Sequence, residues 1–250
     1  MSCYSALFPL KSERSSTQFP SKYAIILRQN NPLLGANMQD YQREFIQFSI
    51  ENNVLRFGEF KLKSGRLSPY FFNTGEFSSG AGLARLGQFY ARAIADQEMM
   101  PDVLYGPAYK GIPLVCAVAI AFAEKDQIDL PFVFNRKEAK DHGEGGVLVG
   151  SGLKGDVLIL DDVITAGTSV RESVKLIEQE GAKPAGVMIA LDRQEKGLDE
   201  RYAIAELSQN YGLKIASIIG LTHIIEYLAE QGNKVSELAN IEAYQKKYGV

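Results

Sequence analysis

Two adjacent carboxylates and a group of hydroxyls follow one apolar run in this sequence. Residues 157–160 read Val-Leu-Ile-Leu, and Asp161 and Asp162 come directly after them. Thr165, Gly167 and a Thr-Ser pair follow, and then a segment of helical periodicity begins. We therefore predict a buried strand, a short polar loop and the start of a helix, with the carboxylates at the carboxyl end of the strand, where α/β sheets bind their ligands.

This polar loop suits a phosphate group. A helix N-terminus offers unpaired backbone N–H groups and a partial positive charge. Gly167 allows a close approach of the backbone, and Thr165, Thr168 and Ser169 add hydroxyl donors. The two carboxylates would repel a phosphate, so we expect them to face sugar hydroxyls or a metal-bound ligand. A helix cap alone needs one such side chain, and the Gly-Lys-Ser/Thr of a Walker P-loop is missing.

Two further segments carry basic side chains beside glycines. Residues 106–111 (GPAYKG) follow a short apolar run and place Lys110 at a predicted helix start, although loops of this composition are common. Residues 136–146 hold three basic and three acidic side chains, which is typical of a solvated surface loop. A mobile loop could neutralise a departing anion while substrate is bound, and His142 could donate a proton there. The other histidine, His223, begins a predicted helix, and we interpret it as structural.

The elements that must position these loops follow from the hydrophobic pattern. Helical spacing covers residues 39–55 and 81–97, and aromatic-rich runs on either side of residues 64–66 predict a β-hairpin. Further strands are expected at residues 102–105, 132–134, 156–160, 186–191 and 215–219, and further helices at residues 111–124, 168–180, 222–231 and 236–248. Apolar strands separated by helices predict one α/β domain with a parallel sheet covered on both faces.

Composition excludes several functional classes. The 27 basic and 30 acidic residues give a net charge of −3, which argues against a general nucleic-acid binder. No stretch reaches the ~18 apolar residues that a membrane span requires. Two cysteines, Cys3 and Cys116, cannot form a disulfide framework or a four-ligand zinc site, and Cys116 is expected to be a buried core residue. A cytoplasmic enzyme or binding domain fits this composition.

Residues 1–37 differ from the rest of the chain. They carry a net charge of +3, with six serines, three prolines and no sustained periodicity, which favours disorder. A transit peptide and an upstream extension before a start at Met38 both fit, and we favour the extension because organised sequence begins just after Met38. The predicted organisation is an extension at residues 1–37, disordered or not native, and a single domain at residues 38–250.

Residues 157–169 closely resemble the phosphoribosyl-diphosphate (PRPP) binding motif of type I phosphoribosyltransferases, and residues 106–111 resemble that family's pyrophosphate-binding loop. With residues 136–146 and 64–73, the resemblance narrows to the orotate phosphoribosyltransferases and covers residues 38–250. It implies a type I phosphoribosyltransferase fold: a mostly parallel central sheet flanked by helices, with an N-terminal helix and hairpin forming a hood. The implied reaction converts orotate and PRPP to orotidine 5′-phosphate and pyrophosphate with Mg²⁺, in pyrimidine (UMP) biosynthesis. We see no appended decarboxylase domain, so the monofunctional type is expected.

The resemblance also assigns roles to matching residues. It places orotate against the backbone of Phe71 and Phe72 and against Arg193, with Thr165 beside it, and it places Lys63 near the base and the diphosphate. It places PRPP against Tyr109 and Lys110, and the diphosphate under Arg136, Lys137, Lys140 and His142 from the partner subunit of a homodimer. The ribose and its 5′-phosphate would be held by Asp161, Asp162, Val163, Ile164, Thr165, Ala166, Gly167, Thr168 and Ser169. The implied catalytic residues are Lys140, His142, Asp161 and Asp162, and no protein ligand to Mg²⁺ is expected because Mg²⁺ is carried mainly by phosphate oxygens.

Two alternatives remain open at this stage. A purine phosphoribosyltransferase would share the PRPP site, but it leaves the hairpin at residues 64–73 and Arg193 unexplained. A PRPP-sensing regulator without turnover would need a nucleic-acid-binding surface. Residues 1–37 are too short for a winged helix and lack apolar periodicity, so this second alternative has little support.

Overall fold

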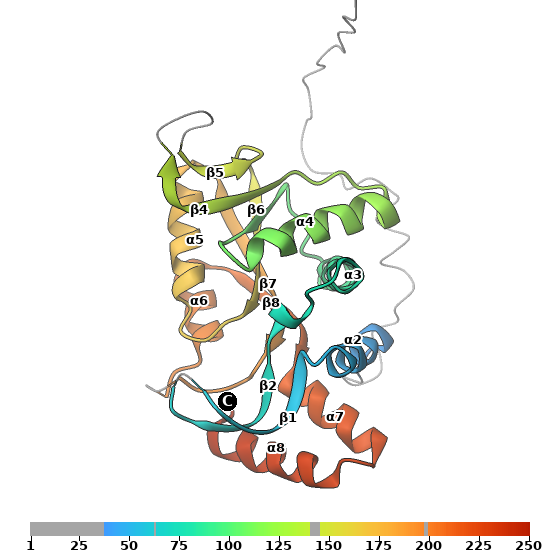
Figure 1. The fold of residues 1–250 in the computed structure, drawn as a ribbon. Helices are drawn as coiled ribbons and strands as arrows, with labels where there is room; N and C mark the ends of the chain where they lie inside the picture. The colour runs from blue at the N-terminus through green and yellow to red at the C-terminus, as the bar shows by residue number, and fades with distance from the viewer. Residues whose placement is uncertain (1–37, 63, 141–145, 198–199) are drawn as a thin grey trace, which may run out of the picture. The chain divides into compact units, whose positions relative to one another are not determined.

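A six-stranded sheet with the strand order β5-β4-β3-β6-β7-β8 forms the centre of the fold (Figure 1). The computed structural model describes residues 38–62, 64–140, 146–197 and 200–250, all within one unit of the chain. Its strands are β3 (Val103–Gly106), β4 (Phe132–Lys140), β5 (Gly146–Gly150), β6 (Asp156–Val163), β7 (Lys183–Asp192) and β8 (Lys214–Gly220). Its α-helices are α2 (Asp40–Glu51), α3 (Gly80–Asp96), α4 (Gly111–Ala121), α5 (Thr168–Gln179), α6 (Ala203–Tyr211), α7 (Leu221–Gln231) and α8 (Val235–Tyr248). Neighbouring strands run parallel except β4 and β5, so the predicted mostly parallel sheet is confirmed.

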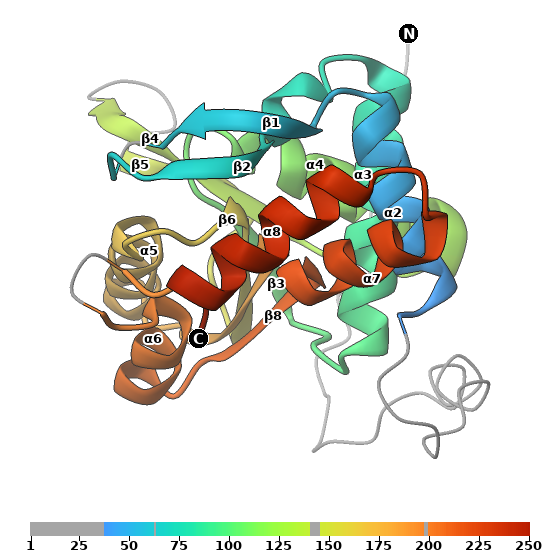
Figure 2. The same cartoon turned by 90° about the horizontal axis from the view of Figure 1, so that it is seen from below.

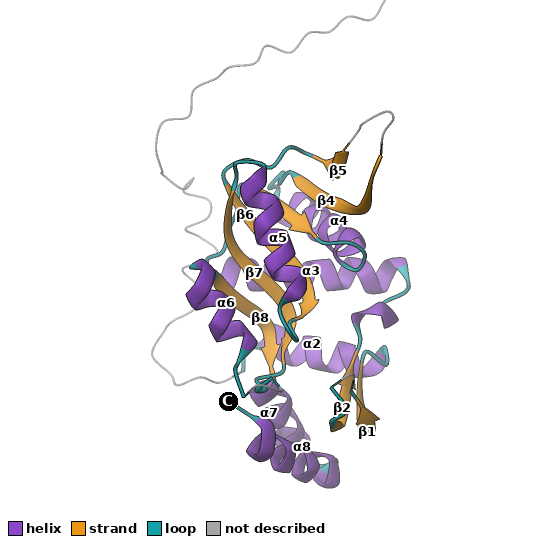
Figure 3. Cartoon of the chain, turned by 90° about the vertical axis from the view of Figure 1, so that its left-hand side faces the viewer, coloured by secondary structure: helices purple, strands orange, loops and turns teal. Residues whose placement is uncertain are grey.

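The central strand β6 is buried on both faces because its side chains alternate between two cores. Val157 and Ile159 belong to a core with α5 and α6, and Leu158 and Leu160 to a core with α3 and α4. Figure 3 shows α5 and α6 in front of the sheet and α3 and α4 behind it. An apolar residue at every position is what two covered faces require, which explains why this strand was readable from the sequence. Within the described residues, no helix is long and apolar enough to cross a bilayer.

The predicted hairpin is also confirmed, as a separate two-stranded sheet of β1 (Leu55–Lys61) and β2 (Leu67–Phe72). The ring of Phe72 lies 6.4 Å from that of Phe45 in α2, so one face of the hairpin joins the core. Gln42 Nε2 donates a hydrogen bond to the Ile218 carbonyl (2.9 Å), which ties α2 to β8. Figure 2 shows α8 between the hairpin and α7. Several elements therefore fix where the hairpin stands beside the main sheet.

Some expectations were wrong. The first helix ends at Glu51 instead of reaching residue 55, because Leu55 already pairs with Phe72 as the start of β1. The strand predicted at residues 132–134 continues to Lys140, and β5 and α6 were not expected. Their sequences carry few buried side chains: in α6, Leu207 alone is buried. Cys116 is half-buried instead of buried, since it lies toward the outer side of α4.

The packing of α3 against α4 leaves no room for a side chain at Gly87. A Cβ atom there would lie 2.4 Å from the Ala117 carbonyl oxygen. We expect Gly87→Ala to lower the free energy of unfolding by about 1–3 kcal/mol, because the backbone of α4 must move to relieve the clash. Urea unfolding followed by far-UV circular dichroism measures this loss.

Gly80→Ala in the same helix is the control, because a Cβ there meets nothing within 4 Å. It should be neutral or stabilising by about 0.4–1 kcal/mol, and equal midpoints for the two variants would contradict the packing argument.

Candidate active site

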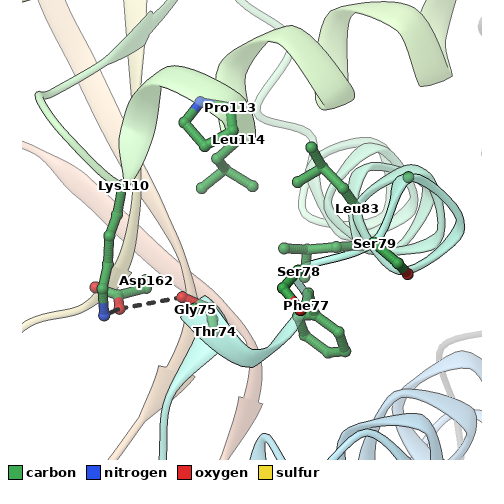
Figure 4. A pocket seen from close by; sticks show the side chains of 12 residues that line it. Thr74, Gly75, Phe77, Ser78, Ser79, Leu83, Lys110, Pro113, Leu114 and Asp162 are labelled. Atoms are coloured by element: carbon green, nitrogen blue, oxygen red, sulfur yellow. Dashed lines mark hydrogen bonds and ion pairs between the residues drawn. The ribbon is translucent and has the colours of Figure 1, made fainter.

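Asp162 joins three parts of the chain at the carboxyl end of β6. Its Oδ2 atom accepts a hydrogen bond from Lys110 Nζ (2.6 Å) and another from Thr74 Oγ1 (3.2 Å), as Figure 4 shows. Lys110 Nζ also donates to Asn73 Oδ1 (3.3 Å). The loop of residues 106–111 and the end of the hairpin are thus drawn to the same carboxylate. Residues 157–169 and residues 106–111, the first two segments singled out in the sequence, therefore meet here. Parallel strands have their carboxyl ends at the same edge of the sheet, so the loops that follow them lie close together.

Asp161 points to the opposite side of β6 and toward the start of α5. Its Oδ1 atom accepts a hydrogen bond from the Asp162 backbone N–H (2.9 Å), and the Ser169 hydroxyl also hydrogen-bonds to its side chain. Burial, and secondly the charge of Asp162, raise the pKa of Asp161 to about 6. Tyr90, fully buried in α3, donates a hydrogen bond to the Asp161 carbonyl (2.7 Å) and so ties this helix to the end of β6. Asp161 is therefore a carboxylate held in place but costly to charge.

The loop between β6 and α5 encloses a small cavity. It measures about 100 Å³ and is lined by Asp161 and residues 163–170. Gly167 adopts a left-handed conformation (φ +73°) just before α5, where a Cβ atom would lie 2.8 Å from Leu207 Cδ1. Arg171 Nη1 donates to the Ala166 carbonyl (2.6 Å), which holds the loop closed on itself. The N–H groups of the first turn of α5 have no partner within the helix, so the cavity can take an anion.

The 106–111 loop is shaped by two glycines in contact. A Cβ atom on Gly106 would lie 2.1 Å from the Gly111 carbonyl oxygen, so neither position tolerates a side chain. Asn135 Oδ1, on β4, accepts hydrogen bonds from the Ala108 backbone N–H (2.9 Å) and from Tyr105 Oη (3.0 Å). The Ala108–Tyr109 peptide bond is cis. Lys110 of this loop reaches Asp162, and the side chain of Tyr109 is 65% exposed.

The segment 136–146 was predicted as a mobile surface loop, and much of it is strand. β4 runs through Arg136 and Lys137 to Lys140, and β5 returns antiparallel from Gly146. Two strands at a sheet edge can leave both faces to water, so a charged sequence does not exclude them. Lys137 Nζ lies 4.8 Å from the centre of the Tyr109 ring, which brings this ribbon to the 106–111 loop. His142 lies outside the described residues, as do Lys63 and the side chain of Lys140.

Arg193 follows β7 and lies beneath the hairpin. Its guanidinium pairs with Glu195 Oε1 (2.7 Å), donates to Ser68 Oγ (3.1 Å) and lies 4.2 Å from the centre of the Tyr70 ring. Phe71 and Phe72 belong to the same strand, β2, with Phe72 turned into the core and Phe71 stacked on Phe60. Strand β2 of the hairpin thus contacts Arg193, and Thr74, just after β2, contacts Asp162.

A pocket of about 360 Å³ opens beside Asp162 and Lys110 (Figure 4). Its other walls are the segment that follows β2 and the first turns of α3 and α4. Apolar side chains such as Leu83 and Leu114 line it away from the ion pair. The described residues hold no group of three or more histidine, cysteine or carboxylate side chains placed to bind a metal. The site therefore has a small cavity at the start of α5, two adjacent carboxylates and the cation of Lys110, and within those residues it has no metal cage.

Comparisons with known proteins agree with this geometry. The sequence model of the phosphoribosyl transferase domain matches residues 75–223. The orotate phosphoribosyltransferase of Pseudomonas aeruginosa is 59% identical over 213 residues, which is 85% of this chain and 100% of the relative. The chain belongs to the orotate phosphoribosyltransferase family. The crystal structure of the Francisella tularensis orotate phosphoribosyltransferase superimposes with a TM-score of 0.76 at 43% identity, covering 83% of this chain and 100% of that one. A Mycobacterium tuberculosis orotate phosphoribosyltransferase solved with PRPP shares the fold (TM-score 0.54, 22% identity, 73% of this chain and 98% of that one).

Several predictions from the sequence are thereby confirmed. The family, the type I phosphoribosyltransferase fold and orotate phosphoribosyltransferase activity in pyrimidine biosynthesis all stand. Sequence reasoning missed the partners that support the orotate phosphoribosyltransferase site: Tyr90 behind the carboxylates, Asn135 behind the 106–111 loop, and Glu195 beside Arg193. These three have ordinary residue types at unremarkable spacings, and what distinguishes them is contact across the fold. His223, in contrast, was interpreted correctly as structural, since its Nδ1 accepts a hydrogen bond from Gly220 N–H (2.8 Å).

The raised pKa of Asp161 predicts a pH dependence of PRPP binding, on the expectation from the sequence that this carboxylate accepts a hydrogen bond from the ribose. The carboxylate takes up a proton as the pH falls through about 6, and a neutral carboxyl group is a weaker acceptor for a sugar hydroxyl. We expect the protonation of Asp161 to raise the dissociation constant for PRPP about tenfold between pH 7 and pH 5. Titration calorimetry at several pH values measures it. Asp161→Asn is the control, because it keeps the shape of the side chain and reports the titration of the ligand alone. Parallel pH profiles for the two proteins would contradict the prediction.

Proposed function

We propose that the junction at Asp162 is the place where this chain brings PRPP and orotate together. The observation that carries the proposal is the contact of Asp162 with both Lys110 and Thr74. Through these contacts β6, the loop of residues 106–111 and the end of the hairpin meet at Asp162. The reaction needs a sugar, a diphosphate and a base held together, and these three elements supply a partner for each.

The 5′-phosphate of PRPP is assigned to the cavity between β6 and α5. The residues proposed to hold it are those of the loop from Val163 to Ser169, whose backbone faces the start of α5. Asp161 and Asp162 lie just before this loop, so a ribose whose phosphate sits in the cavity brings its hydroxyls toward them. Carboxylates accept hydrogen bonds from hydroxyls and repel phosphates, which orients the sugar.

The diphosphate of PRPP is assigned to Lys110 and Tyr109. Lys110 is paired with Asp162, and its side chain is 54% exposed. The ammonium group can therefore leave Asp162 for the diphosphate, and the carboxylate it releases can accept a ribose hydroxyl. Mg²⁺, when bound with PRPP, would reduce the charge of the departing diphosphate. We assign this ion no protein ligand, because the described residues hold no group of side chains placed to bind a metal.

The orotate ring is assigned to the space between β2 and the segment after β7. Arg193 is proposed to pair with the carboxylate of orotate, with Lys63, Thr165 and the backbone of Phe71 and Phe72 around the ring. A planar guanidinium suits a bidentate contact with a carboxylate better than an ammonium group does.

In the reaction, the bond from C1 of the ribose to the diphosphate breaks, and its electron pair stays with the diphosphate oxygen. A bond from C1 to N1 of orotate forms, and the proton of N1 is given up to the departing diphosphate. Positive charge develops on the ribose as the first bond lengthens, and the carboxylates of Asp161 and Asp162 stabilise it from nearby. Lys110 and the basic residues of the β4–β5 ribbon stabilise the negative charge that collects on the diphosphate. The catalytic task is positioning and electrostatics, so no covalent nucleophile is needed.

We further propose that the protein is a homodimer in which residues 136–146 act on the partner's site. Arg136, Lys137, Lys140 and His142 would then close over the partner's diphosphate. Residues 1–37 are proposed as an extension outside the catalytic domain at residues 38–250, and a cytoplasmic location remains a prediction.

Wild-type substrate choice tests the proposed function directly. Orotate should disappear, followed by its ultraviolet absorbance, when PRPP and Mg²⁺ are both present and not when either is left out. Hypoxanthine, adenine and uracil in the same assay should release little pyrophosphate, because none carries a carboxylate for Arg193. Turnover of a purine at the orotate rate would refute the assignment of the base site.

Mixed dimers test whether the ribbon acts across the subunit interface. Lys140→Ala and Asp162→Ala should each be nearly inactive alone, because one removes a cation over the diphosphate and the other a carboxylate at the ribose. In an equal mixture after exchange of subunits, each mixed dimer regains one intact site, so about a quarter of wild-type activity should return. In the control, each variant is cross-linked separately before the two are mixed, so that their subunits cannot exchange. No recovery in dimers shown to be mixed would mean that the ribbon serves its own subunit.

A further inference from the structure

Glu195 lies at the centre of a buried polar group, and Arg193 is its one member with a role in the proposed function. This group, the Glu195 cluster, consists of Ser68, Tyr70, Arg193, Glu195 and Tyr244. Glu195 Oε1 pairs with Arg193 Nη2 (2.7 Å) and accepts a hydrogen bond from Tyr70 Oη (3.2 Å), while Oε2 accepts one from Tyr244 Oη (3.1 Å). The side chains of Arg193 and Glu195 are each 12% exposed. Both carboxylate oxygens are therefore engaged, and the pair is largely withdrawn from water.

The contacts of Arg193 fix the plane and the direction of its guanidinium. Nη2 takes the ion pair and the hydrogen bond to Ser68, and the Tyr70 ring lies against the group at 4.2 Å. The Tyr244 hydroxyl also hydrogen-bonds to the Arg193 side chain. A guanidinium carries five N–H donors, so Arg193 has the capacity to bind a second carboxylate while it keeps these contacts. An arginine held in this way does not have to lose side-chain freedom when it binds a ligand.

The segment that carries Glu195 is itself clamped between the C-terminus and the hairpin. The Lys196 N–H donates to the Tyr248 carbonyl (2.9 Å), and the Val250 N–H donates to the Gln194 carbonyl (3.1 Å). On the other side, Arg66 donates to the Lys196 carbonyl (2.6 Å) and the Gly197 carbonyl (2.8 Å). Glu195 is thus fixed through its backbone as well as through its side chain, which makes it a rigid support.

We propose that Glu195 is a positioning residue that holds Arg193 ready for the carboxylate of orotate. The proposal rests on the role given to Arg193 under the proposed function. Glu195 acts through the arginine, without touching the substrate itself, and Tyr244 extends this support to the C-terminal helix. The opposite view is that Glu195 competes with orotate for Arg193 as a rival anion, and it predicts an effect of opposite sign.

Steady-state kinetics of Glu195→Gln with both substrates varied separate the two views. The amide keeps the size of the side chain but loses the charge, so the guanidinium is no longer fixed before orotate arrives. We expect the KM for orotate to rise about three- to tenfold, which corresponds to the ordering of one long side chain, with the KM for PRPP unchanged. Tyr244→Phe removes one hydroxyl that contacts both Glu195 and Arg193, and it should shift the KM for orotate in the same direction, about twofold.

Glu230→Gln is the matched control. Glu230 makes a paired contact with Arg43 (both distances 2.8 Å) between α2 and α7, outside the site, so its loss should change neither KM. Thermal melting of all variants shows whether each is folded, and Tyr244→Phe decides the question if Glu195→Gln does not fold. An orotate KM that falls in Glu195→Gln would overturn the proposal in favour of competition, and equal rises in both KM values would overturn it in favour of general loosening. An unchanged orotate KM would also overturn it.

Arg193→Ala separates a failure of this inference from a failure of the proposed function. If that variant keeps the wild-type KM for orotate, the assignment of Arg193 to the orotate carboxylate is wrong. If it raises the orotate KM while Glu195→Gln and Tyr244→Phe do not, Arg193 binds orotate and needs no positioning by Glu195.

Discussion

The charge at the carboxyl end of β6 is the constraint on which the site depends. Asp161 and Asp162 leave a strand that is buried on both faces, where ionised carboxylates are costly. Asp161 meets this cost by a raised pKa, and Asp162 by its contacts with Lys110 and Thr74. The second solution draws the 106–111 loop and the end of the hairpin to the strand. One buried charge thus decides where two other parts of the chain lie.

The same logic explains why glycine is needed at the loops around these carboxylates. A loop that approaches a strand end closely enough to pair with a carboxylate has no space for side chains at its contacts. Gly106 and Gly111 meet backbone to backbone, and Gly167 turns in a left-handed conformation against Leu207. The cavity at the start of α5 lies beside this turn, and Gly167 is one of the residues that line it.

The sequence was informative where a structural demand acts on consecutive residues. Strand β6 needs apolar residues at every position, and the loop after it needs hydroxyls and a glycine, so both were predicted correctly. β5 and the outer half of β4 lie at a sheet edge, where charged residues are tolerated, so composition predicted a loop. The supports of the site were not readable at all: Tyr90 contacts Asp161 across 71 positions, and Tyr70 contacts Glu195 across 125. Such contacts depend on how the elements pack, which no local spacing encodes.

The Lys110–Asp162 and Arg193–Glu195 ion pairs differ in how easily they can open, and this difference fits the substrate group proposed for each cation. The Lys110 side chain is 54% exposed, so its ammonium group can exchange Asp162 for a diphosphate while remaining hydrated. Arg193 and Glu195 are both 12% exposed, and separating them would leave an uncompensated charge in the interior, which is strongly destabilising. A ligand at Lys110 can therefore replace the existing partner, whereas a ligand at Arg193 must add to it. An arginine can serve two carboxylates at once because its N–H groups point along more than one edge, and a lysine has no such fixed second edge. A lysine therefore suits position 110, where the ion pair with Asp162 can break. An arginine suits position 193, where the ion pair with Glu195 has to stay.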